Sequence, residues 1–313
     1  MQYHYYLYGM RVTADLDFVQ LDPVRLPEDD RDFGREKVRI RAMDEEEETQ
    51  FRKEHGDCVC GSFLGTEKGW LCNRTLAMSV ERGQVIRYHI REGGDPGAVR
   101  TYLLGFGIAM LSLQQGKLPI HCSALATPEG GAILIAGESG AGKSTLTAEL
   151  LKRGYRFLAD DMAVVDISGK EGVWVYPAFP YMKLCRDVVL RQGYPPEELL
   201  YIDEKKDKFL VPCTGVFQRE KARLERFVFL GIRWKSGKIK AEKITGPDSM
   251  IVYKDNLFLR HLWKKQDPGM EIWQNCLKIA EQIPVFWIRR PAAGDSTAEV
   301  AAEVHALRNV VSA

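Results

Sequence analysis

The chain has 313 residues and a mass of 35.5 kDa, which is comfortable for two domains. Its composition, 45% hydrophobic and 28% charged, excludes a disordered or fibrous protein. Lysine and arginine number 44 against 43 aspartates and glutamates, a net charge of +1, which argues against a nucleic-acid partner.

No membrane partner or secretion is expected either. The longest mostly apolar stretch, 101–113, is shorter than the roughly 20 residues that span a bilayer. The N-terminus lacks the basic and apolar regions of a signal peptide. Seven cysteines, an odd number, make a disulfide framework improbable, so the sequence predicts a cytoplasmic protein.

Residues 1–94 are predicted to form a β-rich N-terminal domain. Aromatic and β-branched residues indicate short strands over 3–7, 11–19, 59–64, 70–79 and 84–90. The acidic run at 44–48 is expected to be a solvated face or loop. Asp95 and Pro96 then begin a helix that is apolar almost all round, and this helix is predicted to be buried and to end at Gly116.

Residues 95–313 are predicted to form an α/β catalytic domain that includes this helix. Its expected strands are 118–126, 132–136, 156–159, 224–232 and 285–288, with a hairpin-like pair over 162–167 and 173–176. Its expected helices are 143–153, 183–192, 267–282 and one capped by Ser296 or Thr297.

A phosphate-binding loop is the clearest chemical signal. The segment GESGAGKS fits G-x-x-x-x-G-K-[ST] between a predicted strand and a predicted helix. Its glycines allow successive N–H groups to face phosphate oxygens, and the helix N-terminus adds positive potential. Lys143 is expected to neutralise the outer phosphates and Ser144 to bind Mg²⁺. The predicted nucleotide-binding residues are Gly137, Glu138, Ser139, Gly140, Ala141, Gly142, Lys143, Ser144 and Thr145.

Two adjacent carboxylates, Asp160 and Asp161, follow the next predicted strand. Neighbouring side chains at a strand tip point in different directions, so one can hold a metal while the other accepts a proton from a hydroxyl. His121 is placed in the strand before the loop, where it is either a core residue or a neighbour of the transferred phosphoryl group.

Residues 121–166 resemble the catalytic domain of HPr kinase/phosphorylase and its bacterial relatives. The resemblance rests on His121, the loop GESGAGKST, the helix end KRG and the phrase GYRFLADD, and the stretch YPAFPYMKL is similar to HPr kinase-like proteins. It implies a core like that of phosphoenolpyruvate carboxykinase and ATP-dependent phosphorylation of a serine hydroxyl. It also implies that Asp160 is the base, that Asp161 helps to hold Mg²⁺, and that His121 lies against the phosphoryl group.

The sequence departs from the HPr enzymes in its N-terminal half and in lacking their Arg-Gly-Leu-Gly-like signature. Some relatives of this size modify lasso-peptide precursors at a serine, so the expected acceptor is a serine of a peptide or protein. A kinase of small metabolites on the same core and a nucleotide-sensing interaction module stay open as alternatives.

Three weaker groups of residues have alternative interpretations. The first group is either a zinc site or a set of ordinary thiols beside a histidine, and it consists of His55, Cys58, Cys60 and Cys72. The cluster 205–208 steers an acidic peptide or is a solvated loop. Lys183 and Arg186, one turn apart on the predicted helix, line the site or face solvent.

Overall fold

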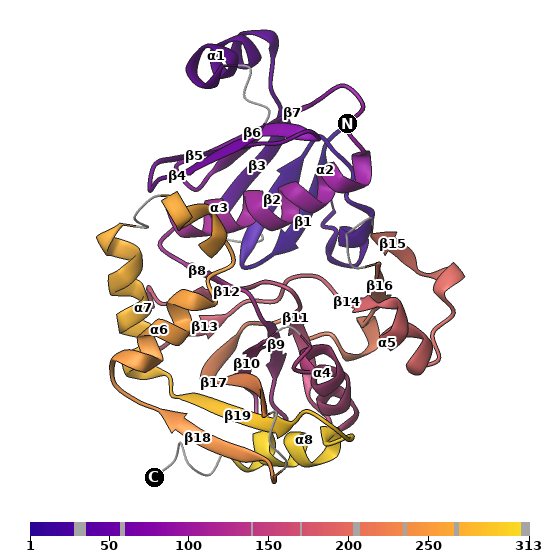
Figure 1. The fold of residues 1–313 in the computed structure, drawn as a ribbon. Helices are drawn as coiled ribbons and strands as arrows, with labels where there is room; N and C mark the ends of the chain where they lie inside the picture. The colour runs from indigo at the N-terminus through magenta and orange to yellow at the C-terminus, as the bar shows by residue number, and fades with distance from the viewer. Residues whose placement is uncertain are drawn as a thin grey trace.

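The computed structural model of the chain is mixed α/β, and its described residues form three sheets (Figure 1). The structure describes residues 1–27, 36–56, 60–138, 140–169, 171–202, 207–233, 237–265 and 269–307.

The N-terminal sheet is mixed, because β2, β3 and β7 run parallel while their other neighbours pair antiparallel. In spatial order its strands are β1 (Tyr3–Leu7), β2 (Met10–Ala14), β3 (Glu36–Ala42), β7 (Val85–Ile90), β6 (Leu76–Glu81), β5 (Lys68–Cys72) and β4 (Gly61–Leu64). The strand expected over 11–19 ends early, and the 3-10 helix η1 (Val19–Val24) follows it. The strand β3 was not predicted.

The acidic run begins a helix, α1 (Glu45–His55), so of the two expectations the loop is wrong, whereas the solvated face is confirmed by the exposed side chains of Glu45 and Glu46. The Asp44 side chain accepts a hydrogen bond from the Glu47 amide at 2.9 Å, and the Glu47 side chain accepts one from the Asp44 amide at 3.1 Å. This capping box satisfies amides of the first turn, where acidic side chains also suit the helix dipole.

One long helix joins the N-terminal sheet to the rest of the chain. It consists of α2 (Pro96–Tyr102), the π-helical segment η2 (Leu103–Gly107) and α3 (Ile108–Gln114). Its 19 residues are long and apolar enough to cross a membrane, which corrects the shorter estimate from the sequence. In this structure 56% of its most apolar window is buried, and the helix lies against the N-terminal sheet (Figure 1), as a core helix does.

The central sheet has the parallel strands β10 (Gly131–Gly137), β17 (Ala222–Arg233) and β19 (Val285–Pro291) at its middle. The other strands that join it are β8 (Leu118–Ile120), β9 (Ser123–Ala126), β11 (Arg156–Ala159), β12 (Ala163–Asp166), β13 (Trp174–Val175) and β18 (Lys240–Ile244). The associated helices are α4 (Lys143–Lys152), α6 (Pro247–Asp255), η5 (Arg260–Lys265), α7 (Met270–Gln282) and α8 (Thr297–Ala306). The residues Asp267 and Pro268, expected to open a helix, lie outside the described residues.

Two predicted elements are corrected by pairing that is distant in sequence. The strand expected over 118–126 is two strands, because β8 pairs with β12 while β9 pairs with β10 and β11. The helix expected over 183–192 begins only at Arg186, because residues before it form a strand of the third sheet. That sheet contains β14 (Tyr181–Cys185), β16 (Lys208–Pro212) and β15 (Leu200–Ile202), and nearby short helices are α5 (Arg186–Arg191), η3 (Pro196–Glu198) and η4 (Thr214–Val216).

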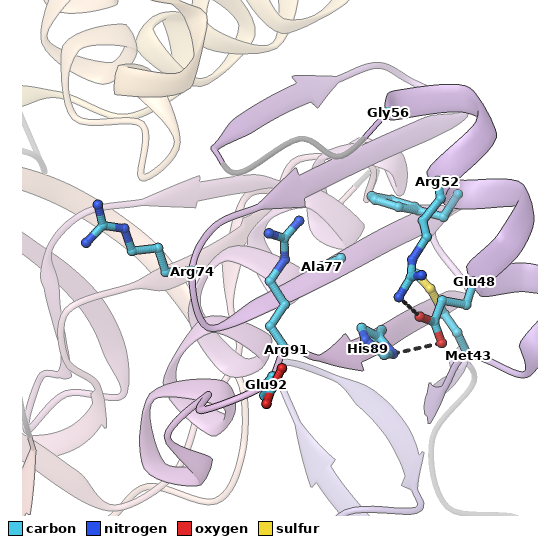
Figure 2. Close-up of a pocket in the computed structure, with 10 residues that line it drawn as sticks. Met43, Glu48, Arg52, Gly56, Arg74, Ala77, His89, Arg91 and Glu92 are labelled. Carbon is cyan, nitrogen blue, oxygen red and sulfur yellow. Dashed lines mark hydrogen bonds and ion pairs between the residues drawn. The ribbon is translucent and has the colours of Figure 1, made fainter.

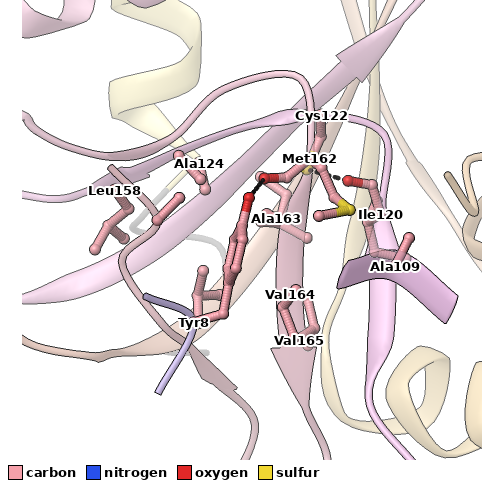
Figure 3. Packing of buried hydrophobic residues seen from close by; sticks show 14 of the residues in the cluster. Tyr8, Ala109, Ile120, Cys122, Ala124, Leu158, Met162, Ala163, Val164 and Val165 are labelled. Atoms are coloured by element: carbon pink, nitrogen blue, oxygen red, sulfur yellow. Dashed lines mark hydrogen bonds between the residues drawn. The ribbon is translucent and has the colours of Figure 1, made fainter. Parts of the chain in front are cut away.

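The tip of the first hairpin inserts into the core beside the central sheet (Figure 3). Tyr8 and Gly9 form a two-residue turn with φ of 53° and 77°, as a type I′ turn requires. The Tyr8 hydroxyl donates to the Met162 carbonyl at 3.2 Å, and the Tyr8 amide donates to the Pro177 carbonyl at 2.7 Å. Tyr8 is 2% exposed, so its ring is buried. The tip of the N-terminal hairpin therefore packs against Met162, the residue after Asp161.

Candidate functional site

The loop between β10 and α4 has the backbone of a tight turn onto a helix N-terminus. Gly140 and Gly142 have φ of 78° and 96°, a left-handed conformation that glycine adopts without strain. The Lys143 ammonium donates to the carbonyl oxygens of Gly137 at 2.8 Å and Glu138 at 3.3 Å, which holds it across the loop. Ser139, also predicted here, lies outside the described residues.

Arg290 of β19 supports the loop from the side, a contact that no local sequence pattern predicts. Its Nε donates to the Ala141 carbonyl at 2.9 Å and one Nη to the Gly140 carbonyl at 3.1 Å. A cavity of about 380 Å³ adjoins this contact and is lined by Gly142, Thr145 and Arg290, among others. The carbonyl oxygens of Gly140 and Ala141 therefore face Arg290.

Strand order brings the loop and the paired carboxylates to one edge of the central sheet. The strand β9 pairs antiparallel with both β10 and β11, so β10 and β11 run parallel and end on the same side. Ser123, the first residue of β9, lies opposite Ile135, two residues before Gly137. The Ser123 hydroxyl also donates to Asp160 at 2.6 Å, so this serine links the two parts of the site.

Both oxygens of the Asp160 carboxylate are held by the protein. Oδ1 accepts from the Ser123 hydroxyl, and Oδ2 accepts from the backbone amide of Lys183 at 2.8 Å. A carboxylate has about four lone-pair positions, so each oxygen can accept a further hydrogen bond. The two donors fix the direction in which the carboxylate faces.

Asp161 has a different environment, formed by the Lys183 ammonium and the His121 ring. The Lys183 ammonium lies 2.9 Å from one Asp161 oxygen, and His121 Nδ1 lies 3.7 Å from the other. Burial raises the pKa of this carboxyl, but Lys183 and His121 outweigh it, so the pKa lies below its ordinary value. Asp161 also has φ of 67°, an uncommon conformation for a residue other than glycine.

His121 lies in the break between β8 and β9, and its expected position within a strand is therefore corrected. Its side chain is 51% exposed, and Nδ1 lies 2.9 Å from the Asp161 carbonyl oxygen. The ring also packs against Phe258, with 5.9 Å between ring centroids. These positions bring together His121, Asp160 and Asp161.

The sequence placed Lys183 wrongly and overlooked Ser123. Because Lys183 is on β14 instead of a helix, its amide reaches Asp160 while its ammonium reaches Asp161. Arg186, the first residue of α5, pairs with Asp207 at 2.6 Å. The only sequence signal for Ser123 is its place two residues after His121.

The other weak candidates lie elsewhere. His55 stacks on Trp70 at 4.4 Å between centroids, and Cys72 is buried and accepts a hydrogen bond from Arg91. Cys58, Lys205 and Lys206 lie outside the described residues, within which no group of three potential metal ligands was found. None of the six cysteines that the structure describes forms a disulfide.

A cavity of about 490 Å³ on the N-terminal sheet is lined by cationic side chains, far from the carboxylates in sequence (Figure 2). Glu48 pairs with both Arg52 and His89, the latter at 3.1 Å. The Arg91 guanidinium contacts the Cys72 sulfur. These cations are therefore engaged by the protein itself.

A cavity of about 900 Å³ opens directly in front of the paired carboxylates. Asp160, Asp161 and Lys183 form part of its wall, together with residues from η1, the long helix and β15. The N-terminal part and the central sheet thus both contribute to the space that faces the carboxylates.

Comparisons with known proteins identify the segment that carries this geometry. The sequence model of the family described as HPr Serine kinase C-terminal domain matches residues 119–177. Proteins named HPr kinase/phosphorylase from Streptococcus salivarius, Streptococcus pyogenes and Streptococcus uberis are each 47% identical over 49 residues. The match covers 16% of this chain and 16% of the length of each relative.

One solved structure, the Hpr(Ser) kinase/phosphatase from Coxiella burnetii, aligns with 62% of this chain and 99% of its own. Its sequence identity is 13% and its TM-score 0.32, a score too low to support a statement about the fold. The family model and the curated relatives confirm the predicted resemblance for this segment: residues 119–177 are similar to the HPr Serine kinase C-terminal domain, and they contain the loop, His121 and both carboxylates.

Proposed function

We propose that this HPr kinase-like chain is a Mg-ATP-dependent kinase with a P-loop core that phosphorylates a serine hydroxyl of a peptide or protein. The observation that carries the proposal is the meeting, at one sheet edge, of the glycine-rich loop with a carboxylate pair. Phosphoryl transfer needs little covalent chemistry from the protein beyond alignment, charge neutralisation and removal of one proton.

The residues present fit a nucleotide and a magnesium ion. The left-handed glycines and the start of α4 direct amides toward an anion, and Lys143 supplies a positive charge. For Mg²⁺ the expected oxygen donors are the half-buried Ser144 hydroxyl and the ionised Asp161 carboxylate. The ion would neutralise charge on the phosphate oxygens.

In the proposed reaction, Asp160 accepts the proton of the serine hydroxyl. The hydroxyl oxygen forms a bond to the γ-phosphorus while the bond from that phosphorus to the bridging oxygen breaks, and ADP is the leaving group. Ser123 and the Lys183 amide keep Asp160 directed toward the acceptor. Lys143 stabilises the charge on the phosphates, and His121 contributes a polar ring beside Asp161.

Substitution of Lys143 tests nucleotide binding. Lys143→Ala removes a charge-assisted contact worth roughly 1.5–3 kcal/mol, so calorimetry should show about 10- to 150-fold weaker binding of Mg-ATP. Lys152→Ala, at the exposed end of the same helix, is the matched control and should bind normally. Unchanged affinity and turnover in Lys143→Ala would refute the assignment of the loop.

A kinase of small metabolites is the second candidate, favoured by the size of the cavity. Its volume of about 900 Å³ lies within the range of sites for small molecules, about 300–1,000 Å³. None of the relatives reported above is named for a lasso peptide, so the acceptor is proposed only as a polypeptide serine. We also propose that residues 1–94 and 95–313 are the two domains of a cytoplasmic enzyme that has neither a nucleic-acid nor a membrane partner.

A further inference from the structure

The cavity in front of Asp160 has an apolar wall that no step of phosphoryl transfer requires. Aromatic rings cluster beside His121: Phe258 lies 5.9 Å from Phe106, and Phe106 lies 5.5 Å from Tyr102, measured between ring centroids. All three line the cavity and are half-buried. They come from the long helix and from the segment after α6, so the wall is assembled by the fold.

The π-helical segment η2 forms part of this wall. Leu104, Gly105 and Phe106 belong to it and line the cavity. In a π-helical turn the backbone hydrogen bonds join residues five apart instead of four, which changes the directions of the side chains. Such turns occur frequently at functional sites. Here the turn lies where the helix passes the carboxylates.

The rim of the cavity is also apolar, and it is open to solvent. Val19 of η1 is 54% exposed, and Leu200 and Tyr201 of β15 are 50% and 48% exposed. Large hydrophobic side chains exposed around one opening are typical of an interaction site. These residues lie in the N-terminal part and in the third sheet, so the apolar lining extends from the carboxylates to both rims.

Most charged groups in the lining are already engaged by the protein. Asp95 accepts a hydrogen bond from the Ala98 amide at 2.7 Å, and Arg100 donates to the Asp17 carbonyl at 2.6 Å. Lys183 is paired with Asp161. The lining carries three carboxylates against two cations, so an acidic occupant would be repelled and an apolar one would find complementary walls.

We propose that this cavity is the acceptor site and that it selects a polypeptide whose serine is flanked by aliphatic or aromatic residues. This inference rests on the proposed function. The serine hydroxyl reaches Asp160 at the inner end, while the neighbouring side chains pack against Tyr102, Phe106 and Phe258 and against the two rims.

A positional-scanning library of peptides with one central serine tests the inference. The full-length chain is incubated with each pool and with γ-labelled ATP. We expect Leu, Ile, Phe and Tyr pools beside the serine to be labelled several-fold more strongly than Asp, Glu or Lys pools. Equal labelling of all pools, or selection of charged residues, would overturn the inference while leaving the kinase assignment intact.

Two variants connect this selection to the cavity. With a preferred peptide, Leu200→Ser should raise KM for the peptide roughly tenfold, the usual effect of a lost apolar contact, with kcat and KM for ATP unchanged. Leu190→Ser is the matched control, since Leu190 on α5 is 57% exposed and does not line the cavity. Equal effects of the two variants would overturn the assignment of the rim.

The outcomes also separate this inference from the proposed function. If calorimetry shows Mg-ATP binding but no pool is labelled, and a small alcohol is labelled instead, the polypeptide acceptor is wrong and the inference fails with it. If peptides are labelled without a preference for apolar residues beside the serine, this inference is refuted and the proposed kinase function stands.

Discussion

Asp160 and Asp161 are adjacent in sequence, yet they have different surroundings. Neutral donors, a hydroxyl and an amide, hold Asp160, whereas the Lys183 ammonium and the His121 ring lie against Asp161. Asp160 can therefore accept a proton without first breaking an ion pair. The low pKa of Asp161 keeps it ionised, as a metal ligand must be.

This difference predicts different phenotypes for two isosteric variants. Asp160→Asn should leave Mg-ATP binding nearly unchanged and reduce transfer by roughly 10²–10⁴-fold, the usual contribution of a general base. Asp161→Asn should raise the Mg²⁺ concentration needed for half-maximal rate, because Mg²⁺ is held through few carboxylates. The measurement is a Mg²⁺ titration of transfer for each variant, with nucleotide binding followed in parallel.

Near-normal rates in both variants would show that the pair is structural. If the two phenotypes are exchanged, the kinase assignment holds, but Asp161 is the proton acceptor and Asp160 the metal ligand. Ser123→Ala is a useful third variant, since it removes only one of the donors to Asp160 and should reduce the rate less than Asp160→Asn.

At the scale of elements, helix α1 is anchored by one carboxylate. Glu47 lies 2.6 Å from one guanidinium nitrogen of Arg41 on β3 and 2.8 Å from Nε of Arg87 on β7. The hydrogen bond from Arg41 lowers the pKa of Glu47 from 4.5 to about 2. A carboxylate with a depressed pKa stabilises the folded state fully above its ordinary pKa and loses this contribution as pH falls through its folded value.

The free energy of unfolding should therefore fall between pH 4.5 and about 2 through Glu47, by roughly 1–3 kcal/mol. Glu47→Gln should lose this part of the acid dependence, measured by urea unfolding at pH values across the window. The control is Glu46→Gln on the same helix turn, where the side chain is exposed. Identical acid profiles for the wild type and Glu47→Gln would contradict the prediction.

The first hairpin gives a test of packing between the two parts of the chain. A Cβ added at Gly9 would lie 2.7 Å from ring atoms of Tyr176, whereas one added at Gly193 meets nothing within 4 Å. Both glycines have φ of +77°, so Gly9→Ala and Gly193→Ala carry the same backbone strain. The overlap should make Gly9→Ala the less stable variant by roughly 1–3 kcal/mol in urea unfolding.

Gly9→Ala should also slow phosphoryl transfer, because displacement of the hairpin moves Tyr8 away from the Met162 carbonyl, one residue after Asp161. Equal stability of the two variants would show that Tyr176 moves aside without cost.

The sequence identified residues of the candidate site more completely than it predicted their arrangement. The glycine-rich loop and the carboxylate pair are local patterns, so their residues could be named in advance, although their roles stay predictions. Lys183 was placed on a helix because the residues after it are helical, whereas pairing of β14 with β16 makes its own segment a strand. Ser123 and Arg290 come close to the site only through strand order, which no local pattern encodes.

At the scale of the whole molecule, the two proposed domains share one hydrophobic core. A single cluster of buried residues extends from Tyr5 and Leu7 through the long helix to the strands of the central sheet. The helix contacts both parts: Arg100 donates to the Asp17 carbonyl in the N-terminal part, and Phe106 packs against Phe258, with 5.9 Å between ring centroids. The acceptor cavity is likewise lined from both sides.

Removal of residues 1–94 should therefore separate nucleotide binding from transfer. A fragment of residues 95–313 retains the loop, Lys143 and both carboxylates, but it exposes the apolar face of the long helix and loses the rim at Val19. We expect this fragment to require the separately expressed 1–94 fragment for solubility, because large exposed apolar surfaces promote association. Where soluble, it should bind Mg-ATP, as calorimetry can show, while labelling of peptides is lost and returns when the two fragments are combined.

A fragment of residues 95–313 that labels peptides at the full-length rate would show that the N-terminal part does not help to form the acceptor site. A folded fragment that fails to bind Mg-ATP would instead show that the division near Asp95 is wrong.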